Sequence, residues 1–464
     1  MSDVVDGATA WLAQGLGDWL QRWSLEQGAE AADAAVARTA GQALSLATRE
    51  GHVCLPLAAL AAADATPDTA PPLDTPTLRA ALLRSRVVGT PQAPGAMPLV
   101  LDDDDRLYLH RYFDYERRLA RRLALSAQAA PTLPTPEVAK RLQQLFKPNA
   151  ALLGGQADWQ QLAAALALRG KLAVVSGGPG TGKTTMVVNL LACLLTQQPD
   201  ARIALAAPTG KAAARMTDAL RQRAAHLPAE LRDRLPASAA TIHRLLGATP
   251  DGFTHDAQNP LPIDALVVDE ASMLDLALAT RLLEAVPPQA RIVLLGDKDQ
   301  LAAVESGAVF AELSADPGLS DAARTDLAAL TGTPPRIIEP PEAARPSALQ
   351  DSAVWFTRNF RFAADSGIGG GGGAVRRHGL PALDTIGGHR AGKALERHVA
   401  QRGIAEGGPG QLAHGGAHGD LARLGQQGLP AQADLGGVLG LELDQTFHAF
   451  DHRKPFAGRV VRGA

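Results

Sequence analysis

Two different patterns of hydrophobic and polar residues divide the chain. Up to about residue 145, apolar residues recur at the three- and four-residue spacing of amphipathic helices, most clearly over 8–23 and 29–49. From residue 158 onward, short apolar runs alternate with helical stretches instead. This second part predicts strands at 171–176, 202–207, 265–269 and 291–296, and helices at 185–195, 211–224 and 275–285.

Apolar strands that alternate with helices indicate crossover connections, which produce a parallel sheet covered by helices on both faces. The sequence therefore predicts an α/β domain over 146–315, preceded by a mostly helical domain over 1–145. A Pro- and Ala-rich stretch, 316–350, is interpreted as a linker or surface insertion. A strand-like run follows, and we interpret 351–369 as the start of a second lobe.

Composition narrows the class of protein. Ala and Leu supply most of the apolar content and aromatic residues only 4%, which favours helices on parallel strands over an all-β fold. The formal net charge of −3 argues against a globally basic nucleic-acid binder but leaves room for a local basic channel. The sequence has no signal-peptide pattern and no apolar run long enough to span a bilayer. We therefore expect a soluble, cytoplasmic protein with no membrane partner.

Two groups of chemically capable residues are interpreted as structural. Cys54 and Cys193 both lie in apolar surroundings, so we expect buried free thiols rather than a disulfide or a metal site. The four acidic residues Asp102 to Asp105 precede an apolar run that reads as a strand. We expect them to form a solvated turn rather than a metal site.

The strongest chemical motif is a glycine-rich loop between the predicted strand 171–176 and the helix after it. The loop fits the P-loop pattern of Gly, four residues, Gly, Lys and then Ser or Thr. Its glycines let backbone N–H groups curl around an anion, and the helix N-terminus adds partial positive charge. We predict that it binds ATP with Mg²⁺, with Lys183 on the β- and γ-phosphates and Thr184 on the metal. The residues expected to hold the nucleotide are Gly177, Gly178, Pro179, Gly180, Thr181, Gly182, Lys183, Thr184 and Thr185.

A pair of acidic residues follows another predicted strand. Asp269 and Glu270 end the apolar run 265–269, about 85 residues after the glycine-rich loop. In a parallel sheet this position puts Asp269 in the coordination shell of the Mg²⁺ ion of a P-loop site. Glu270 is then predicted to polarise the attacking water.

Three further residues are candidates for contacts with the nucleotide. Gln160 precedes the P-loop strand, and its amide fits the edge of adenine; a surface glutamine at a helix start fits the spacing equally well. Gln300 closes the strand 291–296, with Gly296 and Asp297 forming the turn before it, and is expected to sense the γ-phosphate. Arg361 is expected to reach the γ-phosphate from a second lobe, with an ordinary surface arginine as the alternative.

Two short segments contain candidates for nucleic-acid binding. Thr209 and Lys211 follow the strand 202–207, at the sheet edge where ligands bind, and fit a phosphate of a nucleic-acid strand. Thr241 and His243 fit a DNA backbone in the same way. An ordinary loop and a packing or capping histidine are the alternatives, and the residues alone leave them open.

In this order along the chain, the motifs resemble those of RecD, the alpha subunit of RecBCD-type exodeoxyribonuclease V complexes. The resemblance covers about 1–369. It is carried by Gly51–Leu55, Asp105–Arg118, Trp159–Gln160, Gly177–Thr184, Pro208–Arg215, Thr241–Leu246, Asp269–Met273, Gly296–Leu301 and Asn359–Gly369.

This resemblance implies a superfamily 1 helicase that moves 5′ to 3′ along DNA during double-strand break repair and recombination. It implies two RecA-like lobes with ATP between them, and an N-terminal domain that docks on RecB-like and RecC-like subunits. It also implies that Thr209, Lys211, Thr241 and His243 contact the DNA strand. A P-loop kinase would instead need an arginine-rich lid and would lack the Gln300 and Arg361 signals.

The resemblance stops at Gly369. Residues 370–464 hold about half of the 46 glycines and seven of the 12 histidines, without strand–helix alternation or the family's later motifs. We interpret 370–464 as an aberrant, frame-shifted and poorly ordered tail. The chain alone is then expected to bind nucleotide weakly and to hydrolyse little ATP in response to DNA. The alternative function is a truncated, non-motor subunit that binds nucleotide and partners without unwinding DNA.

Overall fold

The computed structural model describes residues 2–63, 73–300, 307, 309–342 and 347–358, with the backbone alone for 2–9. The expectations about Arg361, Asn359–Gly369 and the tail 370–464 lie outside these residues. No helix of the described part is long and apolar enough to cross a membrane.

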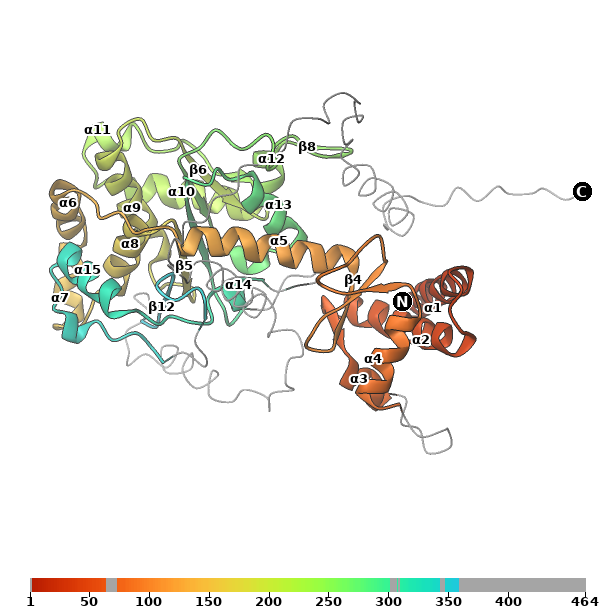
Figure 1. The fold of residues 1–464 in the computed structure, drawn as a ribbon. Coiled ribbons are helices and arrows are strands. Elements are labelled where there is room, and N and C mark those ends of the chain that lie inside the picture. The colour runs from red at the N-terminus through yellow and green to blue at the C-terminus, as the bar shows by residue number, and fades with distance from the viewer. Residues whose placement is uncertain (1, 64–72, 301–306, 308, 343–346, 359–464) are drawn as a thin grey trace, which may run out of the picture.

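The N-terminal part combines a helical hairpin with a small sheet (Figure 1). Its helices are α1 (Ser2–Glu26), α2 (Ala31–Arg49), α3 (Leu57–Ala63) and α4 (Thr75–Arg84). Four described strands pair in the order β1 (Cys54–Pro56), β4 (Arg106–Leu109), β3 (Leu99–Leu101) and β2 (Val88–Gly89). The prediction of a mostly helical domain is right about the helices, and the apolar run expected to form a strand after Asp105 is β4. It does not predict that four strands pair into a sheet, because strands of two to four residues are too short to show an alternating pattern.

A single helix, α5 (His110–Ala127), connects this N-terminal part to the rest of the chain (Figure 1). It packs against α13 (Leu276–Ala285), where Arg118 forms an ion pair with Glu284. Arg122 donates hydrogen bonds to the carbonyl oxygens of Leu283 and Val286, at the C-terminal end of α13. These contacts fix α5 on the second part of the molecule.

The second part is built on a parallel sheet, as predicted. Six described strands lie in the order β12 (Ala353–Phe356), β5 (Leu172–Gly177), β11 (Arg291–Gly296), β10 (Ala265–Val268), β6 (Ile203–Ala207) and β7 (Ala240–Thr241). Every pair in this sheet is parallel. All four strands predicted from the sequence are present, each within one residue of its expected bounds.

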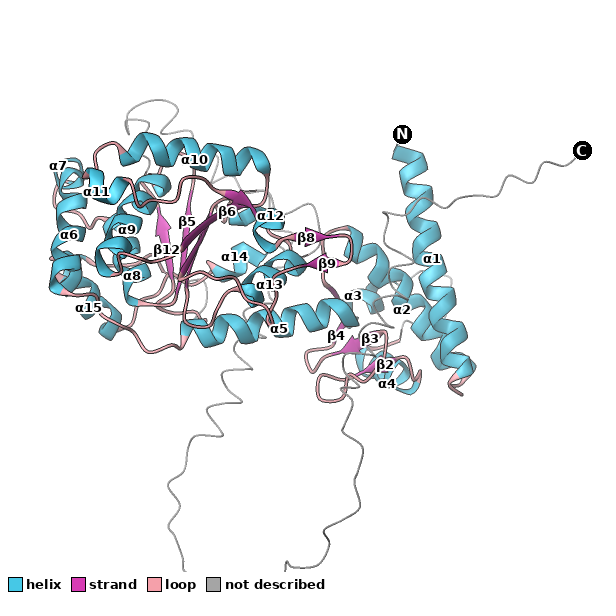
Figure 2. Cartoon of the chain, turned by 90° about the horizontal axis from the view of Figure 1, so that it is seen from above, coloured by secondary structure: helices cyan, strands magenta, loops and turns pink. Residues whose placement is uncertain are grey.

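Side chains alternate along the strands and so divide the core into two layers. Figure 2 shows the helices that lie on either side of the sheet. Val175, Val267 and Leu295 face one layer, which is covered by α6 (Pro136–Phe146), α8 (Trp159–Arg169), α9 (Lys183–Gln197), α10 (Gly210–Ala224) and α15 (Asp321–Thr331). Val174 and Leu266 face the other, which is covered by α5, α12 (Ile242–Leu246), α13 and α14 (Val309–Leu313). Each fully buried aliphatic side chain contributes roughly 1.5–3 kcal/mol to this packing.

Three predicted boundaries are wrong. Helix α6 belongs to the core of the sheet, although it begins within 1–145. The stretch 316–350 is not a linker, because α15 packs against α6 and α8. Strand β12 pairs with β5 in the six-stranded sheet, so 353–356 do not begin a second lobe. A sequence gives the order of strands along the chain but not their order in a sheet.

The remaining short elements lie in the loops around this sheet. They are η1 (Lys147–Asn149), α7 (Ala150–Leu153), α11 (Ala229–Arg232), the hairpin strands β8 (Ala248–Thr249) and β9 (Gly252–Phe253), η2 (Ala271–Met273) and η3 (Pro335–Ile337). Cys54 and Cys193 are both buried free cysteines, as predicted.

Candidate nucleotide-binding site

The glycine-rich loop joins β5 to α9, and its shape depends on glycine at three positions. Gly180 and Gly182 have φ angles of +81° and +88°, which side chains other than glycine rarely adopt. A Cβ atom at Gly182 would lie 2.1 Å from Nε2 of Gln160. A Cβ atom at Gly177 would lie 2.8 Å from both the Thr181 hydroxyl and Cβ of Phe356. The loop therefore follows one path between its neighbours, from the end of a strand to a helix N-terminus.

Lys183 is the first residue of α9, and its ammonium group turns back onto the loop. It donates hydrogen bonds to the carbonyl oxygens of Gly177 and Gly178. Burial lowers the pKa of Lys183, and the negative charge of Asp269, Asp297 and Glu270 opposes that shift. Backbone carbonyls are neutral acceptors, so a phosphate in this loop offers the ammonium group a stronger partner.

Asp269 and Glu270 follow β10, two strands away from β5 in the sheet. The Asp269 carboxylate accepts one hydrogen bond, from the backbone N–H of Glu270 at 2.9 Å. Burial raises the pKa of Asp269, and burial together with the charge of Asp269 raises that of Glu270. The Lys183 charge acts on both carboxylates. The structure thus brings the three residues together at the carboxyl edge of the sheet.

The backbone at Glu270 has a φ angle of +53°, in the left-handed region. Non-glycine residues adopt this conformation at a cost of about 1–3 kcal/mol, and such residues gather at functional sites. In this conformation the chain turns sharply after β10 and enters η2. The turn presents the Asp269 and Glu270 side chains at the edge beside the P-loop.

The described side chains at this edge do not form a complete metal site by themselves. Among the described residues, no group of three or more His, Cys, Asp or Glu side chains could hold a metal ion by itself. The buried Asp269 carboxylate has a raised pKa and a single hydrogen bond, which a divalent cation would complement. The residues therefore fit an ion that arrives with the phosphates, with Thr184 at the second position of α9 as the other protein ligand.

Asp297, expected from the sequence only to form part of a turn, is a third carboxylate at this edge. It is 6% exposed and follows β11, the strand between β5 and β10. Its carbonyl oxygen accepts a hydrogen bond from the N–H of Gln300 at 3.2 Å. Gln300 itself is exposed. Asp297 was detectable in principle, because it follows its strand just as Asp269 follows β10.

Gln160 lies at the start of α8 against the P-loop, and it is 5% exposed. Its Nε2 atom donates to the carbonyl oxygen of Thr181 at 3.0 Å, and its Oε1 atom accepts from Asn149 at 3.3 Å. Gln160 thus supports the P-loop, a role that the sequence analysis omits. Each end of the amide has capacity for a second hydrogen bond, so a contact with adenine stays a prediction.

A cavity of about 490 Å³ opens beside Gln160 and Thr181. Its wall comes from the start of α8, the end of β12 and the segment around η3, and it includes Trp159, Arg336 and Arg358. Arg358 is held there by a hydrogen bond to the carbonyl oxygen of Leu152 at 2.7 Å. The cavity thus adjoins the P-loop on the side where Gln160 lies.

Thr185 is placed differently from its neighbours in the P-loop. Its hydroxyl accepts a hydrogen bond from Arg223 on α10. The predicted contact of Thr185 with nucleotide therefore competes with a contact inside the protein. No sequence pattern predicts this hydrogen bond, because Thr185 and Arg223 meet only through the packing of α9 against α10.

The four candidates for nucleic-acid binding lie at the ends of two paired strands, β6 and β7, and β6 also pairs with β10, which leads to Asp269. Ala207 of β6 pairs with Thr241 of β7, so the segments that follow these strands share one end of the sheet. Thr209 and Thr241 each cap a helix, accepting hydrogen bonds from the N–H groups of Ala212 and Arg244. Their hydroxyl protons stay available for donation.

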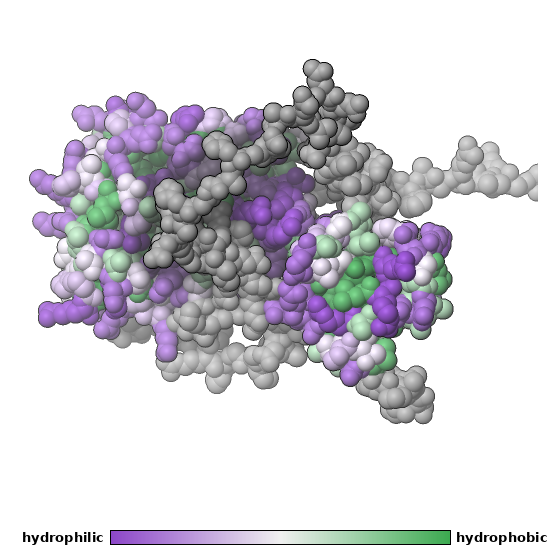
Figure 3. Space-filling model, viewed as in Figure 1, coloured by the Kyte–Doolittle hydropathy of each residue, from purple (hydrophilic) through white to green (hydrophobic). Residues whose placement is uncertain are grey.

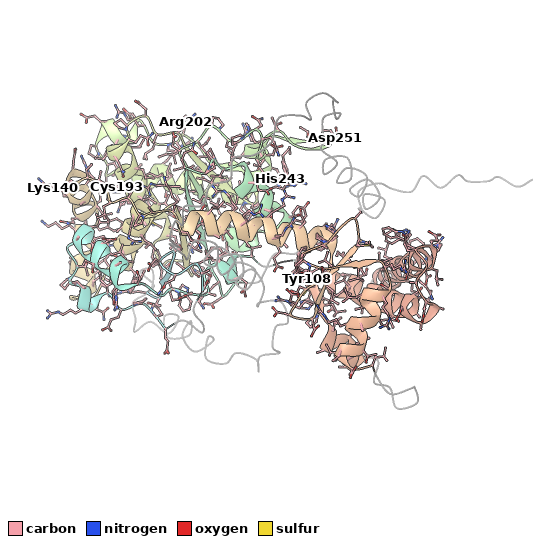
Figure 4. The ribbon with its side chains drawn as sticks, viewed as in Figure 1. Tyr108, Lys140, Cys193, Arg202, His243 and Asp251 are labelled. Carbon is pink, nitrogen blue, oxygen red and sulfur yellow. The ribbon has the colours of Figure 1, made fainter. Side chains whose placement is uncertain are left out.

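The two basic side chains of this group are exposed, which suits a solvent-accessible contact. These are Lys211 and His243. The His243 ring lies 5.8 Å from that of Phe253 in the β8–β9 hairpin, on the same side of the molecule as Asp251 (Figure 4). Contact between these side chains and DNA is not tested by this geometry and stays a prediction.

The parallel sheet, the P-loop and the carboxylates at the same edge define a P-loop nucleotide-binding domain. The family model described as AAA domain matches residues 160–306. The model of the RecBCD enzyme subunit RecD, N-terminal domain, matches residues 18–108. The chain therefore matches a RecD N-terminal model and an AAA model in that order, and its resemblance to RecD is confirmed.

Curated relatives agree with these models. The RecBCD enzyme subunit RecD of Mycolicibacterium smegmatis is 43% identical over 276 residues, which cover 58% of this chain and 47% of that protein. The RecD subunit of Haemophilus influenzae is 35% identical over 275 residues, covering 57% and 42% respectively. The ATP-dependent RecD2 DNA helicase of Deinococcus radiodurans is 44% identical over 137 residues, covering 30% and 17%. The matched region spans just under half the length of the RecD subunits.

Proposed function

We propose that the chain is an ATP-dependent 5′ to 3′ DNA helicase and translocase subunit of a RecBCD-type helicase–nuclease, acting in double-strand break repair and recombination. The observation that carries this proposal is the grouping of Lys183, Asp269 and Glu270 at one sheet edge, inside a domain that follows a RecD N-terminal domain. A relative named as a DNA helicase supports DNA as the substrate, and a relative named as a subunit of the RecBCD enzyme supports the partner subunits.

The residues at this edge divide the work of ATP hydrolysis among them. Lys183 exchanges two carbonyl partners for the β- and γ-phosphates, whose charge keeps it protonated despite its lowered pKa. Thr184 and Asp269 would hold a Mg²⁺ ion, which would neutralise charge on the phosphates. Glu270 orients and polarises the attacking water. Gln300, after β11 of the six-stranded sheet, and Arg361, from a second lobe, are both proposed to contact the γ-phosphate.

The cavity beside Gln160 is proposed to hold the base of the nucleotide. It adjoins the P-loop at Thr181, and Trp159 and Gln160 are among its wall residues. An aromatic ring and an amide are the groups expected around adenine, one for stacking and one for its hydrogen-bonding edge. Gln160 then links the base to the phosphate loop, because its amide already supports the Thr181 carbonyl.

DNA is proposed to cross the sheet edge at β6 and β7. Thr209, Lys211, Thr241 and His243 lie there, beside the nucleotide rather than on it. Hydroxyl groups and one positive charge suit a phosphate backbone and give no base specificity. A translocating enzyme needs this combination, because it must grip any sequence that passes.

The N-terminal domain is proposed to bind the RecB-like and RecC-like partners. It carries exposed large hydrophobic side chains, with Trp11 at 68% and Leu46 at 42% exposure. Figure 3 shows apolar surface on this part of the molecule. Apolar side chains on a surface mark interaction sites when they gather, and aromatic residues dominate the energies of such sites.

The test uses the full chain, alone and together with RecB- and RecC-type subunits from the same genome. Binding of a fluorescent ATP analogue and release of phosphate with and without single-stranded DNA are measured. We expect saturable binding, and DNA-stimulated hydrolysis in the assembled complex that Lys183→Ala removes. Unwinding of a duplex with a 5′ single-stranded tail, but not a 3′ tail, tests the direction. Hydrolysis that ignores DNA in every assembly contradicts the proposal.

A further inference from the structure

Lys298 occupies a bridging position at the nucleotide edge that no role described so far requires. It follows Asp297 in the turn after β11. Its backbone N–H donates to the Ser176 hydroxyl at 3.0 Å. Ser176 belongs to β5 and pairs with Gly296 of β11 on one side and with Trp355 of β12 on the other. The backbone of Lys298 is therefore fixed on the strand that leads into the P-loop.

The side chain of Lys298 continues across that strand to β12. Its Nζ atom lies 4.6 Å from the centroid of the Trp355 ring, within the range of a cation–π interaction. The same Nζ atom is 2.9 Å from a carboxylate oxygen of Asp299. The Trp355 ring is held from its other end, because its indole N–H donates to the carbonyl oxygen of Ser314 at 2.6 Å. Each member of the pair thus has a second partner besides the other.

Strand β12 connects this pair to the nucleotide loop and the cavity. Phe356, the residue after Trp355, lies against Gly177. A Cβ atom added at Gly177 would be 2.8 Å from the Cβ atom of Phe356. Phe356 and Arg358 both line the cavity beside Gln160. Arg361 lies three positions after Arg358 in the sequence, outside the described residues. A movement of β12 therefore changes the wall of the cavity and the start of the segment that carries Arg361.

From these contacts we infer that Lys298 and Trp355 are positioning residues that couple the turn after β11 to β12. The inference rests on the proposed function, in which Gln300 of this turn contacts the γ-phosphate. When the turn responds to that phosphate, the Lys298 ammonium group moves over the Trp355 ring and shifts β12. The pair thus transmits the difference between ATP and ADP from the first sheet to the segment that follows it.

Geometry favours this coupling over a simple packing role. The turn contains three charged residues in succession, Asp297 to Asp299, and the ammonium group of Lys298 lies over an aromatic ring of β12. An apolar side chain would cover the Trp355 ring equally well if packing were the only need. A charge over the ring gives an interaction that depends on position and on the surrounding field, which a bound triphosphate alters.

The test labels the full chain with 5-fluorotryptophan and records ¹⁹F spectra with ADP and with a non-hydrolysable ATP analogue, both with Mg²⁺. The chain has five tryptophans, and the Trp355→Phe variant assigns the signal of interest. We expect the Trp355 signal to differ between the two nucleotides. In Lys298→Met this difference disappears, whereas Lys298→Arg retains it because a guanidinium group also lies over aromatic rings.

Turnover supplies a second measurement. In the assembled complex, Lys298→Met is expected to lower kcat about three- to tenfold while KM changes less than twofold, since a cation–π contact is a modest interaction. Asp299→Asn is the matched control: it removes the ion pair of Lys298 and leaves the ring contact in place. Melting temperatures of all variants show whether Lys298→Met merely loosens the sheet.

Each outcome decides between the ideas. A wild-type chain that binds both nucleotides without any change at Trp355 overturns the coupling, and so does a Lys298→Met variant that keeps the difference. A lowered kcat that Asp299→Asn reproduces in full also overturns it, because the ring contact is then irrelevant. A wild-type chain that binds neither nucleotide contradicts the proposed function itself, and the coupling with it.

Discussion

Two clusters of buried charge in this molecule have opposite designs. In the N-terminal domain, the Asp102 carboxylate is 2% exposed and accepts hydrogen bonds from the N–H groups of Asp104 and Arg106 and from the Arg106 side chain. The hydroxyl of the buried Tyr108, a residue labelled in Figure 4, adds a longer contact to Asp102 at 3.4 Å. At the nucleotide edge, the Asp269 carboxylate accepts a single hydrogen bond.

This difference separates a structural charge from a functional one. Arg106 and its neighbours replace the water that Asp102 loses, so the group is satisfied within the protein. Asp269 and Lys183 lose water without an equal replacement. Burial raises the pKa of Asp269 and lowers the pKa of Lys183, and both shifts favour the neutral form of the group. A bound ligand can supply the interactions that such groups lack inside the protein. For this reason perturbed pKa values gather at functional sites.

The largest expected effect is on catalysis. Lys183→Ala should lower DNA-stimulated ATP hydrolysis by about 10²- to 10³-fold, the usual loss when one preorganised charge at a reacting phosphate is removed. Folding should be unaffected or slightly improved, because a poorly solvated ammonium group is removed. Phosphate release and thermal unfolding measure the two effects.

The control for this variant is Lys171→Ala. Lys171 lies at the other end of β5, where its Nζ atom donates to the carbonyl oxygen of Gln289. It therefore tests the loss of a lysine that adjoins β5 at its start, without touching the P-loop. Equal losses of turnover in both variants would contradict the division drawn between the two clusters, since the effect would then be structural.

The second expected effect is on stability. Asp102→Asn should destabilise the N-terminal domain by about 3 kcal/mol, because Arg106 loses a buried partner and its charge stays in place. Nucleotide binding by the folded protein should stay as in wild type. Urea unfolding followed by circular dichroism measures the change.

Asp103→Asn is the matched control for Asp102→Asn. Asp103 is exposed and accepts a hydrogen bond from the Gln92 side chain. Its replacement should barely move the transition. The comparison also tests the expected solvated turn: the turn is present, but its first acidic residue is buried rather than solvated.

Much of the fold could be predicted because the pattern of apolar residues is local. The strands β5, β6, β10 and β11 are buried on both faces, so each appears as a continuous apolar run. Strand β7 has two residues and leaves no pattern. The packing of α15 was missed because proline-rich segments surround it, and these look like a linker. The place of β12 beside β5 depends on contacts between residues about 180 positions apart.

The candidate site divides in the same way. The P-loop is predictable because its residues are consecutive, and a strand followed by a helix confirms the setting. The support of Thr181 by Gln160, the pairing of Thr185 with Arg223 and the bridge from Lys298 to Trp355 are tertiary contacts. Each joins separate elements, and no spacing along the chain encodes it. Sequence reasoning therefore found the residues that carry chemistry better than those that position them.

A third, smaller effect concerns pH. Burial raises the pKa of Glu270, and the general base must be ionised, so turnover should decline on the acid side at a higher pH than an ordinary glutamate would give. Below that point kcat/KM should fall about tenfold per pH unit. The stability effect has the opposite sign: the folded state holds this proton more tightly, so ionisation costs stability as pH rises through the raised pKa.

Glu270→Gln separates these two effects. It should remove most of the turnover and, near neutral pH, raise the melting temperature of the nucleotide-free protein. Profiles of kcat/KM and of melting temperature against pH supply the measurements. A wild-type acid limb at the pH of an exposed glutamate would place Glu270 in water and remove it from the cluster of unsatisfied charges.

The smallest expected effect comes from a charge pair that is satisfied but exposed. Asp264 accepts hydrogen bonds from the backbone N–H and the guanidinium group of Arg202, and these lower the pKa of Asp264. A lowered carboxylate pKa contributes stability above the unfolded value and loses it as pH falls through the folded one. Because the Arg202 side chain is 60% exposed, water and salt screen the pair. Asp264→Asn should thus shift the urea midpoint only at the limit of detection, and not at all in high salt. A shift as large as that of Asp102→Asn would mean that hydrogen-bond satisfaction alone, without burial, sets the cost of removing a charge in this protein.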